Sequence, residues 1–237
     1  MVESIWILSA TAASIGLFHT LLGPDHYIPF IVMARSRQWS YSKTALITFI
    51  CGTGHVLSSV ILGLLGVMVG IAVERLEYFE SARGNWAAWA LIAFGATYAV
   101  YGIFRAVKNR PHTHLHVHSD GAMHTHEHTH HKEHAHLHKE SMLAKPLPWV
   151  LFVIFVMGPC ESLIPLLMYP AAQHSIPGMI IVATVFGVVT IGTMLGVVLV
   201  GTFGLSYSPL KGAERYSHAI AGFSIFACGW AVQFLGL

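Results

Sequence analysis

Six long apolar segments constrain what this chain can fold into more than any other feature. A helix needs about 20 mostly apolar residues to cross the hydrocarbon core of a bilayer, and each segment reaches that length. Only 10% of the 237 residues are charged, whereas soluble domains carry about 25%. We therefore expect an all-α, polytopic membrane protein with about six transmembrane helices. The segments are residues 5–33, 43–72, 86–107, 147–171, 177–204 and 216–236.

Basic residues in the connections between these segments predict how the chain is oriented. Short cytoplasmic loops carry an excess of Lys and Arg, and here the excess lies in the first, third and fifth connections. The second connection mixes Glu74, Glu77 and Glu80 with Arg75 and Arg83, and the fourth has no Lys or Arg. The pattern predicts a protein of a prokaryotic inner or plasma membrane, with both termini outside. The basic residues are Arg35, Arg37, Lys43, Arg105, Lys108, Arg110, Lys145, Lys211 and Arg215.

Residues 108–145 form a separate histidine-rich segment between two membrane parts, residues 1–107 and 146–237. Its composition cannot bury a core, which predicts disorder in the absence of metal. Alternating histidines supply many imidazoles, which suit nickel, cobalt, copper or zinc. We expect a cytoplasmic metal-binding loop. Twelve of the 17 histidines lie here: His112, His114, His116, His118, His124, His126, His128, His130, His131, His134, His136 and His138.

The two membrane parts resemble each other at one motif. The first has Gly23-Pro24-Asp25-His26 followed by an Ile-Pro pair, and the second has Gly158-Pro159-Cys160-Glu161 followed by Ile-Pro. Three helices per half is an odd number, so equivalent helices would run in opposite directions. The pattern predicts an inverted-topology repeat, which in many secondary transporters places the substrate site between broken helices at the bilayer midplane.

Ionisable residues inside the apolar segments are the candidate functional residues. Each costs about 2.5–3.5 kcal/mol at the bilayer centre on insertion scales, so such residues usually serve a function. Imidazole, carboxylate and thiolate groups are ligands of divalent transition metals. The candidate metal ligands are His19, Asp25, His26, His55, Cys160 and Glu161.

Spacing supports a shared site for the first three candidates. His19 and His26 are seven residues apart, so an ideal helix would place them on one face. Asp25 would lie off that face unless Gly23-Pro24 breaks the helix, because proline removes a helical hydrogen bond. Asp25 would then bind metal directly or orient a histidine.

Structural roles remain open for the other candidates. A lone intramembrane histidine such as His55 can simply bond a neighbouring helix. Cys160 can be a small core residue, and Glu161 can pair with a histidine or cap a half-helix.

The residues His19-x5-Asp25-His26 and Gly52-Thr53-Gly54-His55 resemble the nickel/cobalt transporter superfamily, in particular its small six-helix branch of urease-accessory or nickel-permease-like proteins. The best-known permeases have four residues between the histidine and the Asp-His pair, whereas this chain has five. The resemblance implies a metal-cation permease with His19, Asp25, His26 and His55 at the site.

The leading hypothesis is thus a transporter of divalent transition-metal ions, most of all nickel or cobalt and then zinc, and not an enzyme. One alternative is a transmembrane thiol-disulfide electron carrier, which needs a cysteine pair. A second alternative is an intramembrane metalloenzyme with an open metal position. Expected partners are the metal ion and the lipid bilayer, with a second copy of the chain or a cytoplasmic metallochaperone as further candidates. The net charge of +2 suggests no nucleic acid. The sequence leaves uptake and efflux both open.

Overall fold

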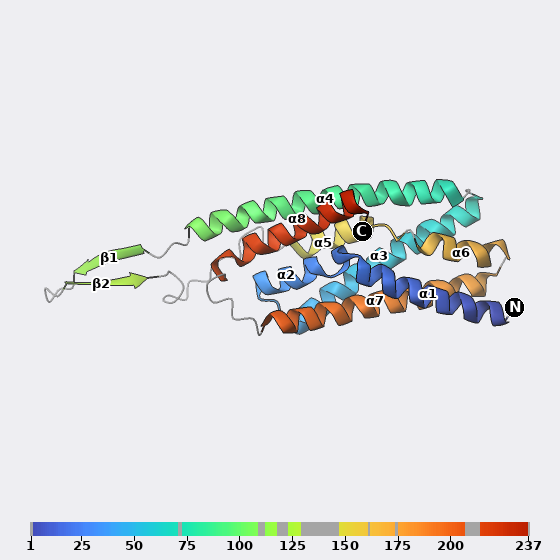
Figure 1. Ribbon diagram of the computed structural model, residues 1–237, viewed down its shortest axis with the longest axis horizontal. Helices are drawn as coiled ribbons and strands as arrows, with labels where there is room; N and C mark the ends of the chain where they lie inside the picture. Colours follow the sequence, from blue (N-terminus) through green and yellow to red (C-terminus); the bar gives the residue numbers. More distant parts are fainter. Residues whose placement is uncertain are drawn as a thin grey trace.

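The computed structural model describes the chain apart from residues 1, 71–72, 109–111, 118–122, 129–146, 161, 174, 207–213 and 237. The described residues form a bundle of α-helices and one small β-hairpin (Figure 1). Five of the described helices are long and apolar enough to cross a membrane, which agrees with the predicted membrane class. They are α1 (Val2–Leu22), α3 (Tyr41–Val69), α4 (Val73–Lys108), α7 (Ile176–Ser206) and α8 (Ser217–Leu235).

The first apolar segment is broken, as its Gly-Pro pair predicts. Helix α1 ends at Leu22, a short 3-10 helix η1 covers Pro24–His26, and α2 runs over Ile28–Arg37. Gly23 is extended, with φ −86° and ψ 96°, and Pro24 has no N–H with which to continue the helix. Helices α1 and α2 therefore follow one another along the molecule (Figure 1).

The fourth apolar segment is also broken, although the sequence predicts one helix over residues 147–171. Helix α5 covers Leu147–Met157 and α6 covers Leu163–Ala172. Pro159 again removes a backbone donor. Each piece is too short to cross a bilayer by itself, since a crossing takes about 20 residues. Together α5 and α6 lie end to end, as α1 and α2 do (Figure 1).

Helix α4 begins at Val73, well before the predicted start at residue 86. The charged residues of the expected second connection therefore lie within a helix. Glutamate, arginine, leucine and alanine are good helix formers. A search for apolar segments does not find this stretch, because its glutamates and arginines are charged. At a rise of 1.5 Å per residue, α4 is about 54 Å long, against about 30 Å for the hydrocarbon core.

Small residues allow α4 and α8 to lie very close together. A Cβ atom added at Gly222 of α8 would collide with the backbone of Ala99, and one added at Gly102 of α4 would collide with the backbone of Ala219. Close backbone approach through glycine and alanine is the usual way in which helices associate in lipid. Other helix pairs in extensive contact include α1 with α7, α3 with α5 and α7, and α2 with α8.

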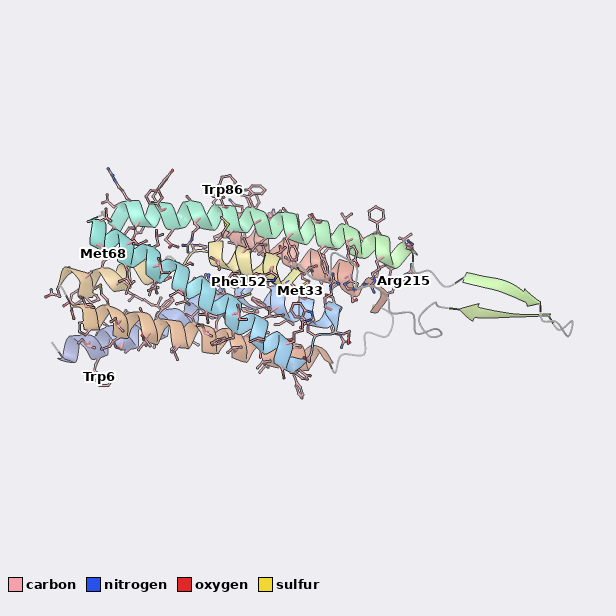
Figure 2. The ribbon with its side chains drawn as sticks, turned by 180° about the vertical axis from the view of Figure 1, so that it is seen from behind. Trp6, Met33, Met68, Trp86, Phe152 and Arg215 are labelled. Carbon is pink, nitrogen blue, oxygen red and sulfur yellow. The ribbon has the colours of Figure 1, made fainter. Side chains whose placement is uncertain are left out.

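Large apolar side chains cover the outside of the bundle. Trp6 is 72% exposed and Trp86 is 68% exposed, and both project from the surface (Figure 2). Leu151, Phe186 and Met194 are completely buried between the helices. Exposed apolar side chains along long helices are expected where lipid, and not water, is the neighbour.

The histidine-rich segment contains a β-hairpin, although its composition predicts disorder. Strand β1 (His112–Val117) pairs antiparallel with β2 (Met123–His128), and His112 lies opposite His128. Alternation of histidine with other residues has the two-residue period of a strand, which explains the difference. His118, His130, His131, His134, His136 and His138 lie outside the described residues. The division into two membrane halves and a loop remains a prediction.

Candidate metal centre

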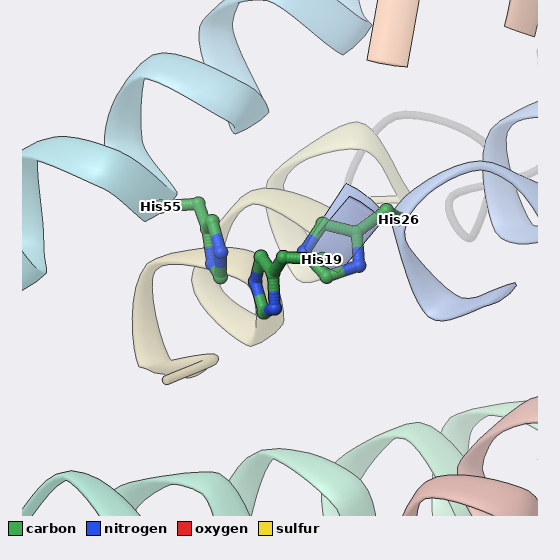
Figure 3. A group of neighbouring side chains, drawn as sticks. All are labelled: His19, His26 and His55. Carbon is green, nitrogen blue, oxygen red and sulfur yellow. The ribbon is translucent and has the colours of Figure 1, made fainter. Parts of the chain in front are cut away.

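Three histidines from three elements come together inside the bundle (Figure 3). His19 lies in the last turn of α1, His26 in η1 and His55 in the middle of α3. One ligand atom from each ring lies within 4.8 Å of those from the other two. His26 and His55 are each 3% exposed. The structure thus joins His55 to the two histidines of the first segment.

His19 and His26 are in contact across the helix break. Their ring centroids are 4.7 Å apart, and the 3-10 turn at Pro24–His26 follows the end of α1 between them. The centroid of His26 is also 5.1 Å from that of His55.

Hydrogen bonds fix which nitrogen of His26 is available to a ligand. Its Nδ1 lies 3.1 Å from Asp25 Oδ1 and 3.2 Å from the Gly23 carbonyl oxygen. Both neighbours are acceptors, so Nδ1 carries the proton and donates it. Nε2 is then the atom with a lone pair, and it is buried without a hydrogen-bond partner among the described residues. Asp25 therefore orients the His26 ring, which is one of the two roles that the sequence leaves open for it.

His55 is held in the same way by the second helix break. Its Nδ1 lies 3.2 Å from the carbonyl oxygen of Phe155, so this ring also donates from Nδ1. This carbonyl also accepts a bond of 3.1 Å from the Gly158 N–H, and its second lone pair is available to His55 because Pro159, four positions later, has no N–H. His55 Nε2 is buried and has no hydrogen-bond partner in the described part of the chain. Histidines that bind metal typically donate the other ring N–H to a carboxylate or carbonyl in this way.

Cys160 lies beside this cluster, in the connection between α5 and α6. Its side chain is completely buried, and its Sγ is 3.9 Å from His19 Nε2. Glu161, the other candidate of this motif, lies outside the described residues. The structure therefore brings together His19, His26 and His55, with Asp25 and Cys160 in contact with them.

A small cavity reaches the cluster from the side of α4. It has a volume of about 30 Å³, room for a water molecule or an ion. Its walls include Asp25 and His55, together with Gly84 of α4 and Pro159. The side chain of Asp25 keeps 29% of its surface exposed. The cavity is thus a small, mostly apolar space that reaches the cluster at Asp25 and His55.

Sequence reasoning missed three groups near the site. The Phe155 carbonyl carries no sequence signal of its own, although a proline four residues later could have indicated it. Glu80 and Arg83 lie three residues apart in α4 and form an ion pair of 3.1 Å. Their spacing fits a helical pair, but the sequence assigned them to a loop outside the membrane.

His218 is also buried but belongs to a different cluster. Its Nδ1 lies 2.8 Å from the Tyr98 hydroxyl, and its Nε2 accepts a hydrogen bond of 2.9 Å from Arg105. Both of its nitrogens are therefore engaged, which distinguishes it from His26 and His55.

No protein-family model, curated protein or solved structure matches this chain. The candidate site therefore has to be interpreted from its own chemistry.

Proposed function

We propose that this chain is a membrane transporter of divalent transition-metal ions, with nickel or cobalt as the leading substrates and zinc next. The observation that carries the proposal is the buried cluster of His19, His26 and His55, in which two rings present a free Nε2. Imidazole nitrogen suits these ions. A helix bundle in lipid has little structural reason to bring three histidines and an aspartate together.

Ion binding would draw the three rings closer together. At a metal–nitrogen distance of about 2.1 Å, tetrahedral geometry separates ligand atoms by about 3.4 Å. The three ligand atoms lie within 4.8 Å of one another, so shortening the longest separation by about 1.4 Å suffices. Asp25, in contact with His26, would offset part of the charge of the ion.

The inverted repeat remains part of the proposal, and the order of the elements supports it. A broken helix (α1–α2 or α5–α6) is followed in each half by two long helices. Helix α3 packs against α5 and α6, while α7 packs against α1 and α2. In such a repeat, rocking of one half against the other opens the central site to alternate sides of the membrane.

The histidine-rich segment would act as a second, weaker binding element for the same ions. Its strands pair histidine with histidine across the hairpin, at His112 and His128 and at His116 and His124. The Lys/Arg pattern of the connections supports a cytoplasmic position for this segment and external termini. There it would collect ions for export or receive them after import.

Flux of labelled nickel and cobalt into proteoliposomes tests the proposal. We expect wild-type protein to move the ions, and His26→Ala to reduce the flux at least tenfold, because the ion loses one of its ligands. His218→Asn is the matched control, since it removes a buried histidine outside the cluster. Wild-type flux no higher than that of empty liposomes, or a His26→Ala flux equal to wild type, would refute the assignment.

A further inference from the structure

The break between α5 and α6 is fixed by two side chains from α4. Arg83 donates a hydrogen bond of 2.9 Å from Nη2 to the carbonyl oxygen of Gly158. The backbone N–H of Cys160 donates a bond of 3.2 Å to Glu80 Oε2. A broken helix leaves backbone groups without helical partners. Here the two charged side chains satisfy one group on each side of Pro159.

Glu80 and Arg83 are themselves held in place by α3. Arg83 Nη2 donates a bond of 2.7 Å to the Ser59 hydroxyl, and Ser59 donates to Glu80 Oε2 at 3.3 Å. Glu80 and Ser59 are completely buried, whereas 20% of the Arg83 side chain is exposed. The pair therefore joins α3, α4 and the α5–α6 connection through a continuous set of hydrogen bonds.

Stability alone is a poor reason for this arrangement. Burying two charges costs several kcal/mol per ion, and replacing a buried ion pair by apolar residues is often neutral or stabilising. The pair also lies directly beside the candidate metal centre, because Cys160 bonds to Glu80 through its N–H while its Sγ faces His19. The backbone of Cys160 thus has little freedom to turn the thiol away.

The two helix breaks differ in this respect. Among the described residues, the break at Gly23–Tyr27 is held by hydrogen bonds within its own segment. Gly23 N–H donates to the carbonyl of His19, His26 N–H to that of Gly23, and the Tyr27 hydroxyl to that of Leu21. The break after α5 also has local bonds, from Gly158 N–H to Ile154 and from Leu163 N–H to Cys160, but it is tied in addition to another helix by the bonds to α4. A special requirement on the orientation of Cys160 would explain the difference.

We propose that Glu80 and Arg83 are positioning residues for the metal centre, which hold the α5–α6 connection so that the Cys160 sulfur serves as a fourth ligand beside the three histidines. This inference rests on the proposed function, since it concerns the same site. On binding, the thiol would give up its proton to solvent, as thiol ligands of metals do. Glu80 and Arg83 themselves do not touch the ion.

Cobalt binding to the full-length, detergent-purified protein tests the proposal, because cobalt bound to a thiolate has a charge-transfer absorption that cobalt bound to nitrogen lacks. We expect wild-type protein to have this band and Cys160→Ser to lose it. We expect the double variant Glu80→Leu/Arg83→Met to lose at least four-fifths of the band, while the d–d absorption of histidine-bound cobalt persists. Affinity should fall about 10–100-fold, as for other residues that orient metal ligands. Removing both charges together leaves no unpaired buried charge.

Two comparisons separate positioning from general damage. Glu77→Leu/Arg75→Met makes the same changes at exposed positions of the same helix, and we expect the wild-type band. Adding Cys160→Ser to the Glu80/Arg83 variant should cause no further loss of affinity, because the pair acts through that sulfur. If the double variant does not fold, Glu80→Gln, which keeps an acceptor for the Cys160 N–H, should have a band between wild type and Cys160→Ser.

The outcomes distinguish this inference from the proposed function. A full-strength band in the Glu80/Arg83 variant, or in Glu80→Gln if only that variant folds, would overturn the positioning role. Cobalt binding without a thiolate band in wild type would overturn the inference and leave the transporter proposal standing. No cobalt binding by wild type would overturn both.

Discussion

At the scale of single residues, the candidate centre depends on which nitrogen of each imidazole is left free. Asp25 and the Gly23 carbonyl hold the proton of His26 on Nδ1, and the Phe155 carbonyl does the same for His55. In both rings Nε2 therefore keeps its lone pair. Two carbonyls and one carboxylate would thus orient the rings for a cation before it binds.

Asp25→Asn tests this preparation. The amide oxygen can still accept the His26 proton, but it carries no charge. We expect the dissociation constant for cobalt to rise about 10–100-fold, as for other partners of metal-binding histidines, with little change in thermal stability. Isothermal titration in detergent measures the constant, and Glu77→Gln, an exposed carboxylate of α4, is the control. A constant within threefold of wild type would contradict the role given to Asp25.

The residue types of the site could be predicted from the sequence, but their arrangement could not. His19, Asp25, His26 and His55 stand out because charged and imidazole groups are costly in apolar segments. The sequence also indicates the break at Gly23–Pro24. It cannot indicate that the rings of His19 and His26 meet across the break, or that a backbone carbonyl 100 residues from His55 orients its ring. Those relations exist only after the helices pack.

At the scale of elements, the two broken helices shape the site from opposite sides. The break after α1 carries His26, and the break after α5 exposes the carbonyl that orients His55. The sequence predicts the first break correctly but gives residues 147–171 as one helix. It also places the start of α4 too late. The first turns of α4 are charged, and a hydropathy pattern does not identify such a helix when its charged side chains bond inside the bundle.

Pro159→Ala tests the role of the second break. Alanine restores a backbone N–H that can bond to the Phe155 carbonyl, so α5 can continue and this N–H competes with His55 for the same acceptor. We expect at least a tenfold weaker affinity for cobalt in the same titration. Pro148→Ala is the matched control, because Pro148 lies in the first turn of α5, where no helical donor is needed. Equal affinities in the two variants would show that the break does not matter for binding.

At the scale of the whole molecule, the close contact of α4 with α8 joins the two predicted halves of the chain. Each helix is the last long one of its half, and their backbones approach through Gly95, Gly102 and Gly222. Van der Waals contact of this kind is a main source of helix association in lipid. If the halves rock as proposed, we expect the motion to pivot about this contact and not to separate it.

Gly222→Ala tests the importance of the contact for stability. A Cβ at this position collides with the backbone of Ala99, which cannot move aside as a flexible side chain could. We expect the free energy of unfolding to fall by about 1–3 kcal/mol, the usual effect of overpacking, measured by denaturation in mixed micelles. Gly192→Ala is the control, because nothing lies within 4 Å of a Cβ there. Equal stability of the two variants would mean that α4 and α8 adjust without cost.

The same contact has a consequence for how the protein is made. Residues 109–216 separate the end of α4 from the start of α8, so a ribosome delivers α4 to the membrane long before its partner exists. Until then the side of α4 that carries Gly95 and Gly102 would lack its partner helix. A chain cut before Ser217 would therefore be expected to enter the membrane and then be removed by quality-control proteases.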